Sequence, residues 1–242
     1  MRQAVPLLGR DRPQLELRPL LLSDGSVEML KWIAAVLMVG DHINKYLLHE
    51  SVPALFDVGR LAMPLFAIVL GYNLARPSEG LYARVAVRLA IAGGLASAPF
   101  IALGGLGWGW WPLNIMATFL LATLICWLLD SGGAPRIAAA AALFVVGGSS
   151  VEFWWPGVAV CVAAWSYARK PSWHALICAV LAVFALRFIN GNDWALPSFV
   201  VLLAATRVPG SMRLQRGRLF FYAFYPLHLA LLWISQRALQ FQ

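Results

Sequence analysis

The chain has 242 residues, of which 61% are hydrophobic and only 12% are charged, and its formal net charge is +8. Soluble domains are about half apolar and about a quarter charged, so this composition excludes an ordinary water-soluble fold. The basic residues are dispersed at the ends of apolar blocks instead of lining one face, which argues against nucleic-acid binding. The three cysteines lie inside apolar blocks without metal-ligand spacing, so we expect no metal site.

The apolar blocks have lengths of roughly 15–22 residues, enough for tilted helices to cross a hydrocarbon core of about 30 Å. Gly or Pro punctuates the gaps between them. We therefore predict an all-α fold, a polytopic transmembrane bundle of about eight or nine helices. In chain order the candidate spans are 27–48, 59–75, 83–103, 112–129, 137–148, 155–167, 173–189, 194–206 and 219–239.

The distribution of Lys and Arg predicts the topology. Residues 1–25 are interpreted as a basic amino-terminal arm, and residues 26–242 as a single transmembrane domain. The arm contains no adequate apolar stretch or small-residue cleavage site, so we expect no removable signal peptide. Lys and Arg recur in alternate connections, and by the positive-inside rule these connections and the amino terminus face the cytoplasm. The pattern predicts a multi-pass protein of a bacterial inner membrane, in contact with the lipid bilayer, whose oligomeric state is open.

The first span contains two ionisable residues in its periplasmic half, Asp41 and His42. Such side chains cost roughly 2.5–3.5 kcal/mol in hydrocarbon and need a partner or a function. His42 could act as a general base, since an unperturbed imidazole titrates near pH 6.5. Adjacent side chains on a helix point about 100° apart, so a partner for His42 is expected from another helix. Alternatively, Asp41 pairs with Lys45 and His42 bonds a backbone carbonyl, serving only to join helices.

The second span begins with Asp57 and Arg60, three residues apart. These could form an ordinary ion pair. Arg60 could instead face the same cavity as His42, where its fixed charge would stabilise a carbonyl oxygen that becomes negative during acyl transfer.

Further polar residues occur in later spans. His228 lies near mid-membrane beside Pro226, and is either a second site residue or an interhelical hydrogen-bonding group. Asn114 and Glu152 lie near the periplasmic half, as do Arg187 and Asn190. We expect several of these side chains to share one water-filled cavity.

Three arginines, Arg76, Arg84 and Arg88, form a compact cluster at the cytoplasmic side. Positive-inside topology accounts for them. The alternative is that they bind the phosphates of a cytosolic cofactor such as coenzyme A, because a guanidinium offers two donors to phosphate oxygens. No Gly-rich phosphate loop accompanies the cluster.

Several of these segments, taken together and in order, resemble the TraX family of conjugative pilus proteins. The resemblance extends over most of the chain, and within the family it is strongest to the TrbP-type conjugal transfer proteins. The matching segments are 30–32 with 41–43, 60–67 with 71–76, 113–115 and 224–228.

This resemblance implies a fold like that of membrane acyltransferases, acetyl-CoA as the acyl donor and a pilin amino terminus as the acceptor. It implies that Asp41 and His42 are catalytic. The supporting active-site residues would be Arg60, His228 and Asn114, and the residues for coenzyme A would be Arg76, Arg84 and Arg88.

Other functions are compatible with the same residues. A non-enzymatic assembly factor would hold pilin subunits in the membrane and use the polar groups only to join helices. An enzyme of the same type could transfer the acyl group to a different periplasmic acceptor. A transporter is a third possibility, although the sequence shows no pair of matching halves.

Overall fold

The computed structural model describes residues 17–208, 217 and 219–240. The first 16 residues of the predicted basic arm lie outside this part. Within it every regular element is a helix, and β-structure is limited to two isolated bridges. The helices are α1 (Asp24–Tyr46), α2 (Pro53–Gly59), α3 (Ala62–Leu74), α4 (Leu81–Ala102), α5 (Ile115–Ser131), α6 (Ala134–Ala142), the π-helical η1 (Leu143–Gly147), α7 (Trp154–Arg169), α8 (Trp173–Ala185), α9 (Arg187–Asn190), α10 (Ser198–Thr206) and α11 (Phe220–Gln240).

The observed helices follow the predicted spans. Each predicted span contains one helix or a consecutive pair, such as α6 with η1 or α8 with α9. The eighth span contains only α10, which is nine residues long. The second span starts earlier than predicted, because α2 precedes α3 with a short break around Arg60. Pro64 lies in the first turn of α3, where its missing N–H breaks no helical hydrogen bond.

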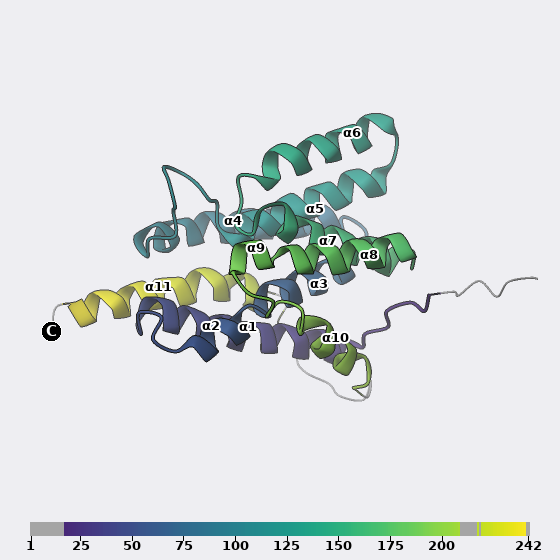
Figure 1. The fold of residues 1–242 in the computed structure, drawn as a ribbon. Helices are drawn as coiled ribbons and strands as arrows, with labels where there is room; N and C mark the ends of the chain where they lie inside the picture. The colour runs from purple at the N-terminus through teal and green to yellow at the C-terminus, as the bar shows by residue number, and fades with distance from the viewer. Residues whose placement is uncertain (1–16, 209–216, 218, 241–242) are drawn as a thin grey trace, which may run out of the picture.

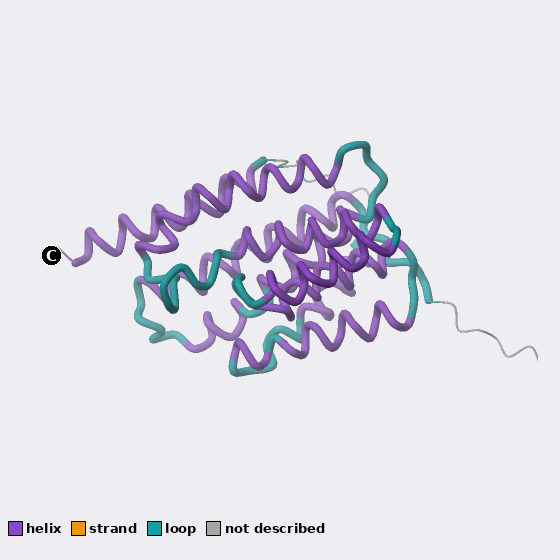
Figure 2. Tube along the Cα trace, turned by 90° about the horizontal axis from the view of Figure 1, so that it is seen from above, coloured by secondary structure: helices purple, strands orange, loops and turns teal. Residues whose placement is uncertain are grey.

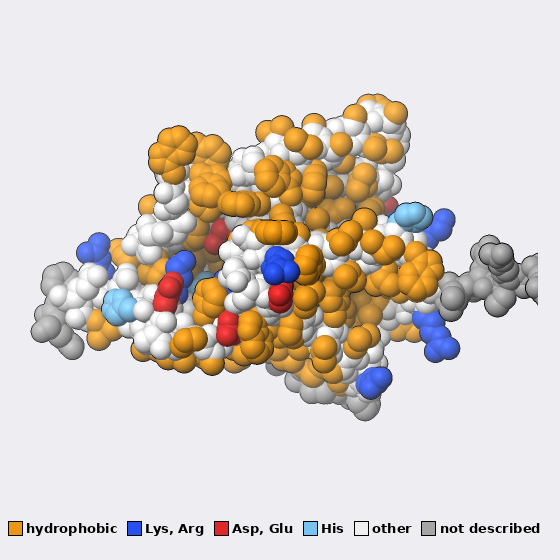
Figure 3. Space-filling view, viewed as in Figure 1, with side chains coloured by type: hydrophobic (Ala, Val, Ile, Leu, Met, Phe, Trp, Pro, Cys, Tyr) orange, Lys and Arg blue, Asp and Glu red, His pale blue; other side chains and the backbone are white. Residues whose placement is uncertain are grey.

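The protein is a helical membrane bundle. Three segments of the described chain are long and apolar enough to cross a bilayer, Pro53–Leu74, Leu81–Ala102 and Trp173–Asn190. The long helices run in roughly one common direction (Figures 1 and 2). Hydrophobic side chains cover most of the face shown in Figure 3. Val36 is 67% exposed and Leu95 is 65% exposed, as expected for side chains that contact lipid instead of water.

Helix packing brings distant parts of the chain together. α3 packs against α7, and α7 also packs against α8. α11 returns to lie against α4 and α1 (Figure 1). The α3–α7 contact depends on Gly71, because a Cβ there would lie 2.4 Å from the carbonyl oxygen of Cys161. The missing side chain of Gly71 therefore lets α3 and α7 approach closely.

Candidate active site

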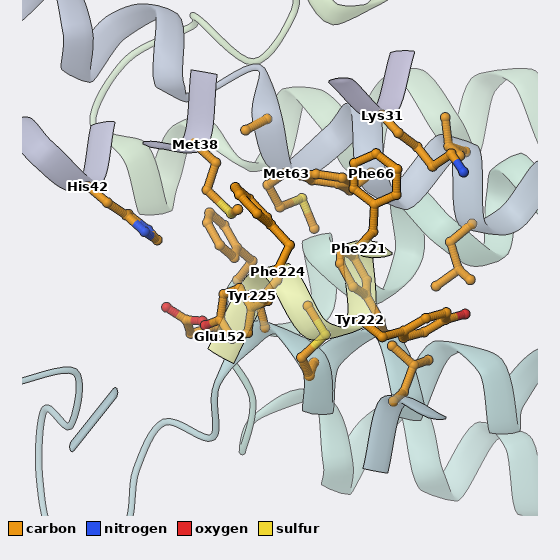
Figure 4. Close-up of a pocket in the computed structure, with 18 of the residues that line it drawn as sticks. Lys31, Met38, His42, Met63, Phe66, Glu152, Phe221, Tyr222, Phe224 and Tyr225 are labelled. Carbon is orange, nitrogen blue, oxygen red and sulfur yellow. The ribbon is translucent and has the colours of Figure 1, made fainter. Parts of the chain in front are cut away.

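A cavity of about 630 Å³ lies between α1, α3, α4, α5 and α11. Its lining includes residues from Asp24 to Tyr46, so it follows α1 for about 33 Å at 1.5 Å per residue. The middle of the cavity is apolar, and Figure 4 shows Met38, Met63 and Phe224 around it. Charged side chains line both ends. They are Asp24, Glu28, Lys31, Arg76 and Arg88 at the end where α1 begins, and Asp41, Lys45, Glu50, Arg60 and Glu152 at the end where it finishes.

His42 lines the cavity and bonds a histidine from another helix, as predicted. Its Nδ1 lies 2.8 Å from Nε2 of His228, on α11, and the two rings are nearly parallel. His228 is buried, and its Nδ1 lies 3.1 Å from the carbonyl oxygen of Phe224. The two histidines therefore form a chain that ends at a backbone carbonyl.

This chain fixes the proton positions of the neutral pair. A carbonyl oxygen only accepts, so His228 must carry its proton on Nδ1 to make that bond. Nε2 of His228 is then the acceptor, and Nδ1 of His42 is the donor. Nε2 of His42 is left without a proton, as a general base requires. Figure 4 shows the His42 ring projecting into the cavity opposite Glu152.

Asp41 is paired with Arg60. The Arg60 guanidinium donates to Oδ2 of Asp41 and, from Nε, to the Phe56 carbonyl at 3.1 Å. It also lies over the Phe56 ring, 4.2 Å from the ring centre. Both charged groups line the cavity beside His42. Arg60 thus presents a fixed positive charge in the same space as the histidine base.

The ion pair depends on a glycine. Gly59 ends α2 and is buried against α1. A Cβ at this position would lie 2.5 Å from Cβ of Asp41. The absence of a side chain lets the break between α2 and α3 approach α1 closely enough for Arg60 to reach the carboxylate.

Two simpler pairings considered from the sequence do not occur. Asp57 accepts from Asn192 at 2.9 Å, so it is not the partner of Arg60. Lys45 is exposed and lies over the Tyr46 ring, 5.2 Å from its centre, while Asp41 pairs with Arg60 instead. The reason is the position of the α2–α3 break, which turns Arg60 toward α1.

Asn114 has a different environment from the other predicted site residues. Its Oδ1 caps α5 by accepting from the Met116 amide at 3.1 Å. Its Nδ2 donates to the Gly93 carbonyl at 2.9 Å and to Ser97 Oγ at 3.2 Å. Asn114 therefore joins α5 to α4, next to the cavity-lining residues Ile115 and Met116.

The arginine cluster divides in two. Arg76 and Arg88 line the cavity, where Arg76 pairs with Asp24 at 2.8 Å and Arg88 lies 5.9 Å from the centre of the Tyr222 ring.

Arg84 is exposed and donates to the Glu79 carbonyl and to Ser78 Oγ. The structure thus brings two of the three predicted arginines to one cavity end.

The structure also adds a buried ion pair that the sequence interpretation missed. Glu28 is only 4% exposed and accepts from Lys31 at 2.6 Å, and both line the cavity beside Arg76. Their spacing of three on a helix was the available signal. Both residues lie close to the start of α1, at the predicted cytoplasmic end of the first span.

Comparison with known proteins identifies the family. The family described as TraX protein matches residues 26–236, which extend from the first turns of α1 to the last turns of α11. The chain belongs to the TraX family. The resemblance predicted from the ordered motifs is thus confirmed, and the TraX match contains both histidines and the Asp41–Arg60 pair.

Two TraX relatives align along most of their length. Protein TraX from Escherichia coli is 28% identical over 225 residues, and Protein TraX from Escherichia coli strain K12 is 26% identical over 223 residues. Each alignment covers 88% of this chain and 88% of the relative. No solved structure matches the chain.

Proposed function

We propose that this TraX-family chain is a membrane acyltransferase that moves an acetyl group from acetyl-CoA to a conjugative pilin during pilus maturation. The observation that carries the proposal is a cavity that follows α1, with cationic side chains at one end and a histidine base beside an arginine at the other. Acyl transfer between the two sides of a membrane requires a group that binds the donor at one end of the cavity and a base with a charge-stabilising group at the other.

The end where α1 begins suits the donor. Arg76 and Arg88 offer planar guanidinium groups to phosphate oxygens. Lys31 adds a third cation, and in the described part of the lining the acidic side chains at this end are Asp24 and Glu28. The apolar middle of the cavity, with Met63 and Phe224, suits an uncharged arm of the acyl donor. Acetyl-CoA supplies an activated thioester, and these residues would bind and orient it.

The histidine end suits the transfer. His42 Nε2 accepts the proton that the acceptor amine loses on attack, and Nδ1 stays bonded to His228. The Arg60 guanidinium stabilises the negative charge that develops on the carbonyl oxygen. Asp41 holds Arg60 in place through their ion pair. General-base catalysis by such a positioned residue contributes about 10²–10⁴-fold.

In this proposal the chain is a multi-pass protein of a bacterial inner membrane with its amino terminus in the cytoplasm. The arginine end of the cavity then opens toward cytosolic acetyl-CoA, and the histidine end toward the periplasmic pilin. The alternation of basic connections supports this orientation.

The deciding experiment combines purified protein, acetyl-CoA labelled in the acetyl group, and pilin with a free amino terminus. We expect label to enter pilin with the natural chain and not with His42→Ala. His174→Ala is the matched control, because His174 is exposed at the start of α8. Pilin that co-purifies with the chain but gains no label would contradict the proposal and favour an assembly factor.

A further inference from the structure

Glu152 is a cavity carboxylate that the transfer described above does not use. It lies in the loop between η1 and α7 and is half-buried. Its side chain lines the cavity at the histidine end, and Figure 4 shows it facing His42.

The loop holds Glu152 in a defined position. Its amide donates to the Leu113 carbonyl at 2.8 Å, and its carbonyl accepts from Oγ1 of buried Thr118 at 2.7 Å. The Leu113 amide in turn donates to the Ser150 carbonyl at 2.9 Å. The backbone is thus fixed on both sides of Glu152, so its carboxylate reaches into the cavity from a rigid base.

The charged side chains around Glu152 favour a cationic ligand. Arg60 is already paired with Asp41, and Lys45 is exposed. Among the described lining residues, this end has three carboxylates and two cations, whereas the opposite end has two carboxylates and three cations. A ligand bound next to Glu152 therefore meets a net negative environment.

The pKa of Glu152 also suits proton exchange with an amine. Burial raises the pKa of Glu152 to about 7, against the opposing effects of Lys45, the Ile115 amide and Arg60. The α-ammonium group of a peptide has a pKa of about 7.7–8.0. Since the two pKa values are close, a proton passes from the ammonium to the carboxylate at small cost. The groups that interact electrostatically with Glu152 are Lys45, Arg60, Tyr46 and Tyr225.

We propose that Glu152 receives the protonated amino group of the acceptor and takes its first proton, which leaves His42 to take the second. This inference rests on the proposed function and makes the acceptor an amine that enters as a cation. The free amine nitrogen then bonds to the acyl carbon as the carbon–sulfur bond of the thioester breaks. The proton released from nitrogen goes to His42 Nε2, and the thiolate leaves.

The test uses the full-length chain with Glu152→Gln, which keeps the shape and removes the charge. We expect the KM for a pilin amino-terminal peptide to rise about tenfold or more, because a charge-assisted hydrogen bond is lost. The KM for acetyl-CoA should stay unchanged. Glu79→Gln is the matched control, since Glu79 is exposed between α3 and α4. Glu152→Asp should recover part of the affinity.

Two further measurements separate a binding role from a merely structural one. In the natural chain, peptide affinity should fall as the pH is lowered through about 7, because protonation removes the negative charge of Glu152. In Glu152→Gln this loss should vanish. A peptide with a hydroxyl in place of its terminal amine should bind the natural chain more weakly, and the variant should lose this discrimination.

The outcomes for the two proposals are distinct. If the natural chain transfers acetyl to pilin while Glu152→Gln keeps the natural KM and pH profile, the role of Glu152 is refuted and the transferase stands. If the natural chain transfers nothing at any pH, the transferase itself is refuted, and the role of Glu152 with it.

Discussion

The two ends of the cavity hold their charges in different ways. At the histidine end, Asp41 and Arg60 form a mostly buried pair, and His42 is bonded to His228 on a helix far along the chain. At the opposite end, Arg76 and Asp24 form a pair whose two side chains are 42% and 50% exposed. The Glu28–Lys31 pair at this end is mostly buried, but both partners lie on α1. Among these contacts, only those at the histidine end are mostly buried and also made between separate segments of the chain.

This difference fits what each end would do in the proposed function. A phosphate needs cations that can adjust to it, and the exposed Arg76 and the half-buried Arg88 supply them at little cost to stability. A proton-transfer site needs groups held within a fraction of an ångström, and a packed interface between α1 and α11 provides this. The described charged residues at the two ends also have opposite net charges, which in the proposed function would favour an anionic donor at one end and an amine at the other.

The largest expected effect is at the histidine pair. His42→Ala should lower acetyl transfer by about 10²–10⁴-fold, because the base is lost. His228→Ala should cause a smaller loss, since the base remains but its Nδ1 partner is gone. Single-turnover rates with labelled acetyl-CoA measure both. Equal losses from the two variants would mean that His228 does more than orient the ring.

The next effect is at the ion pair. Arg60→Gln leaves the Asp41 carboxylate buried without its cation, which should lower the free energy of unfolding by about 3–5 kcal/mol. The double variant Asp41→Asn, Arg60→Gln should recover most of this stability in a detergent melting experiment. It should not recover the transfer rate, because the guanidinium is still absent. Recovery of both would remove Arg60 from catalysis.

A smaller effect is expected at Gly59. Gly59→Ala places a methyl group 2.5 Å from Cβ of Asp41, and overpacking of this kind costs about 1–3 kcal/mol. The melting temperature and the transfer rate should both fall. Gly94→Ala is the control, since nothing lies within 4 Å of an added Cβ there. If the two variants have the same melting temperature, the close approach of α2 to α1 is not required for stability.

The smallest effect belongs to the arginine end. Arg88→Gln should raise the KM for acetyl-CoA several-fold with kcat little changed, because one of several phosphate donors is lost. Arg136→Gln serves as the control, since Arg136 is exposed at the start of α6 and bonds the Ser131 carbonyl. A kcat effect as large as that of His42→Ala would contradict the division of roles between the two ends.

Much of the fold could be predicted from the sequence, because apolar block length and Gly or Pro punctuation are local signals. The helices of the described part follow the predicted spans, apart from the early start of the second and the nine-residue length of α10. Three segments of this part are long and apolar enough by themselves to cross a bilayer. The histidine pair could be predicted only in part. The sequence indicated that His42 needs a partner from another helix, whereas the identity of that partner depends on how α11 packs against α1.

Partner choice at the other charged residues could not be predicted in the same way. Arg60 is three residues from Asp57, which made that pair the simplest prediction, yet it bonds Asp41, 19 residues away. Glu152 was recognised as a polar group of the periplasmic half, but its position opposite His42 depends on a loop fixed by Leu113 and Thr118. Such contacts have no periodicity along the chain.

The sequence by itself determined that the chain is a helical membrane protein, where its helices lie and which side chains are too costly to leave in hydrocarbon without a partner. These properties depend on composition and spacing, which are local. Only the tertiary structure decided that His42 bonds His228, that Arg60 bonds Asp41 and that Glu152 faces His42 (Figure 4). The physical reason is that each of these contacts requires two backbones to approach at one point, and the approach of α2 to α1 depends on the missing side chain of Gly59.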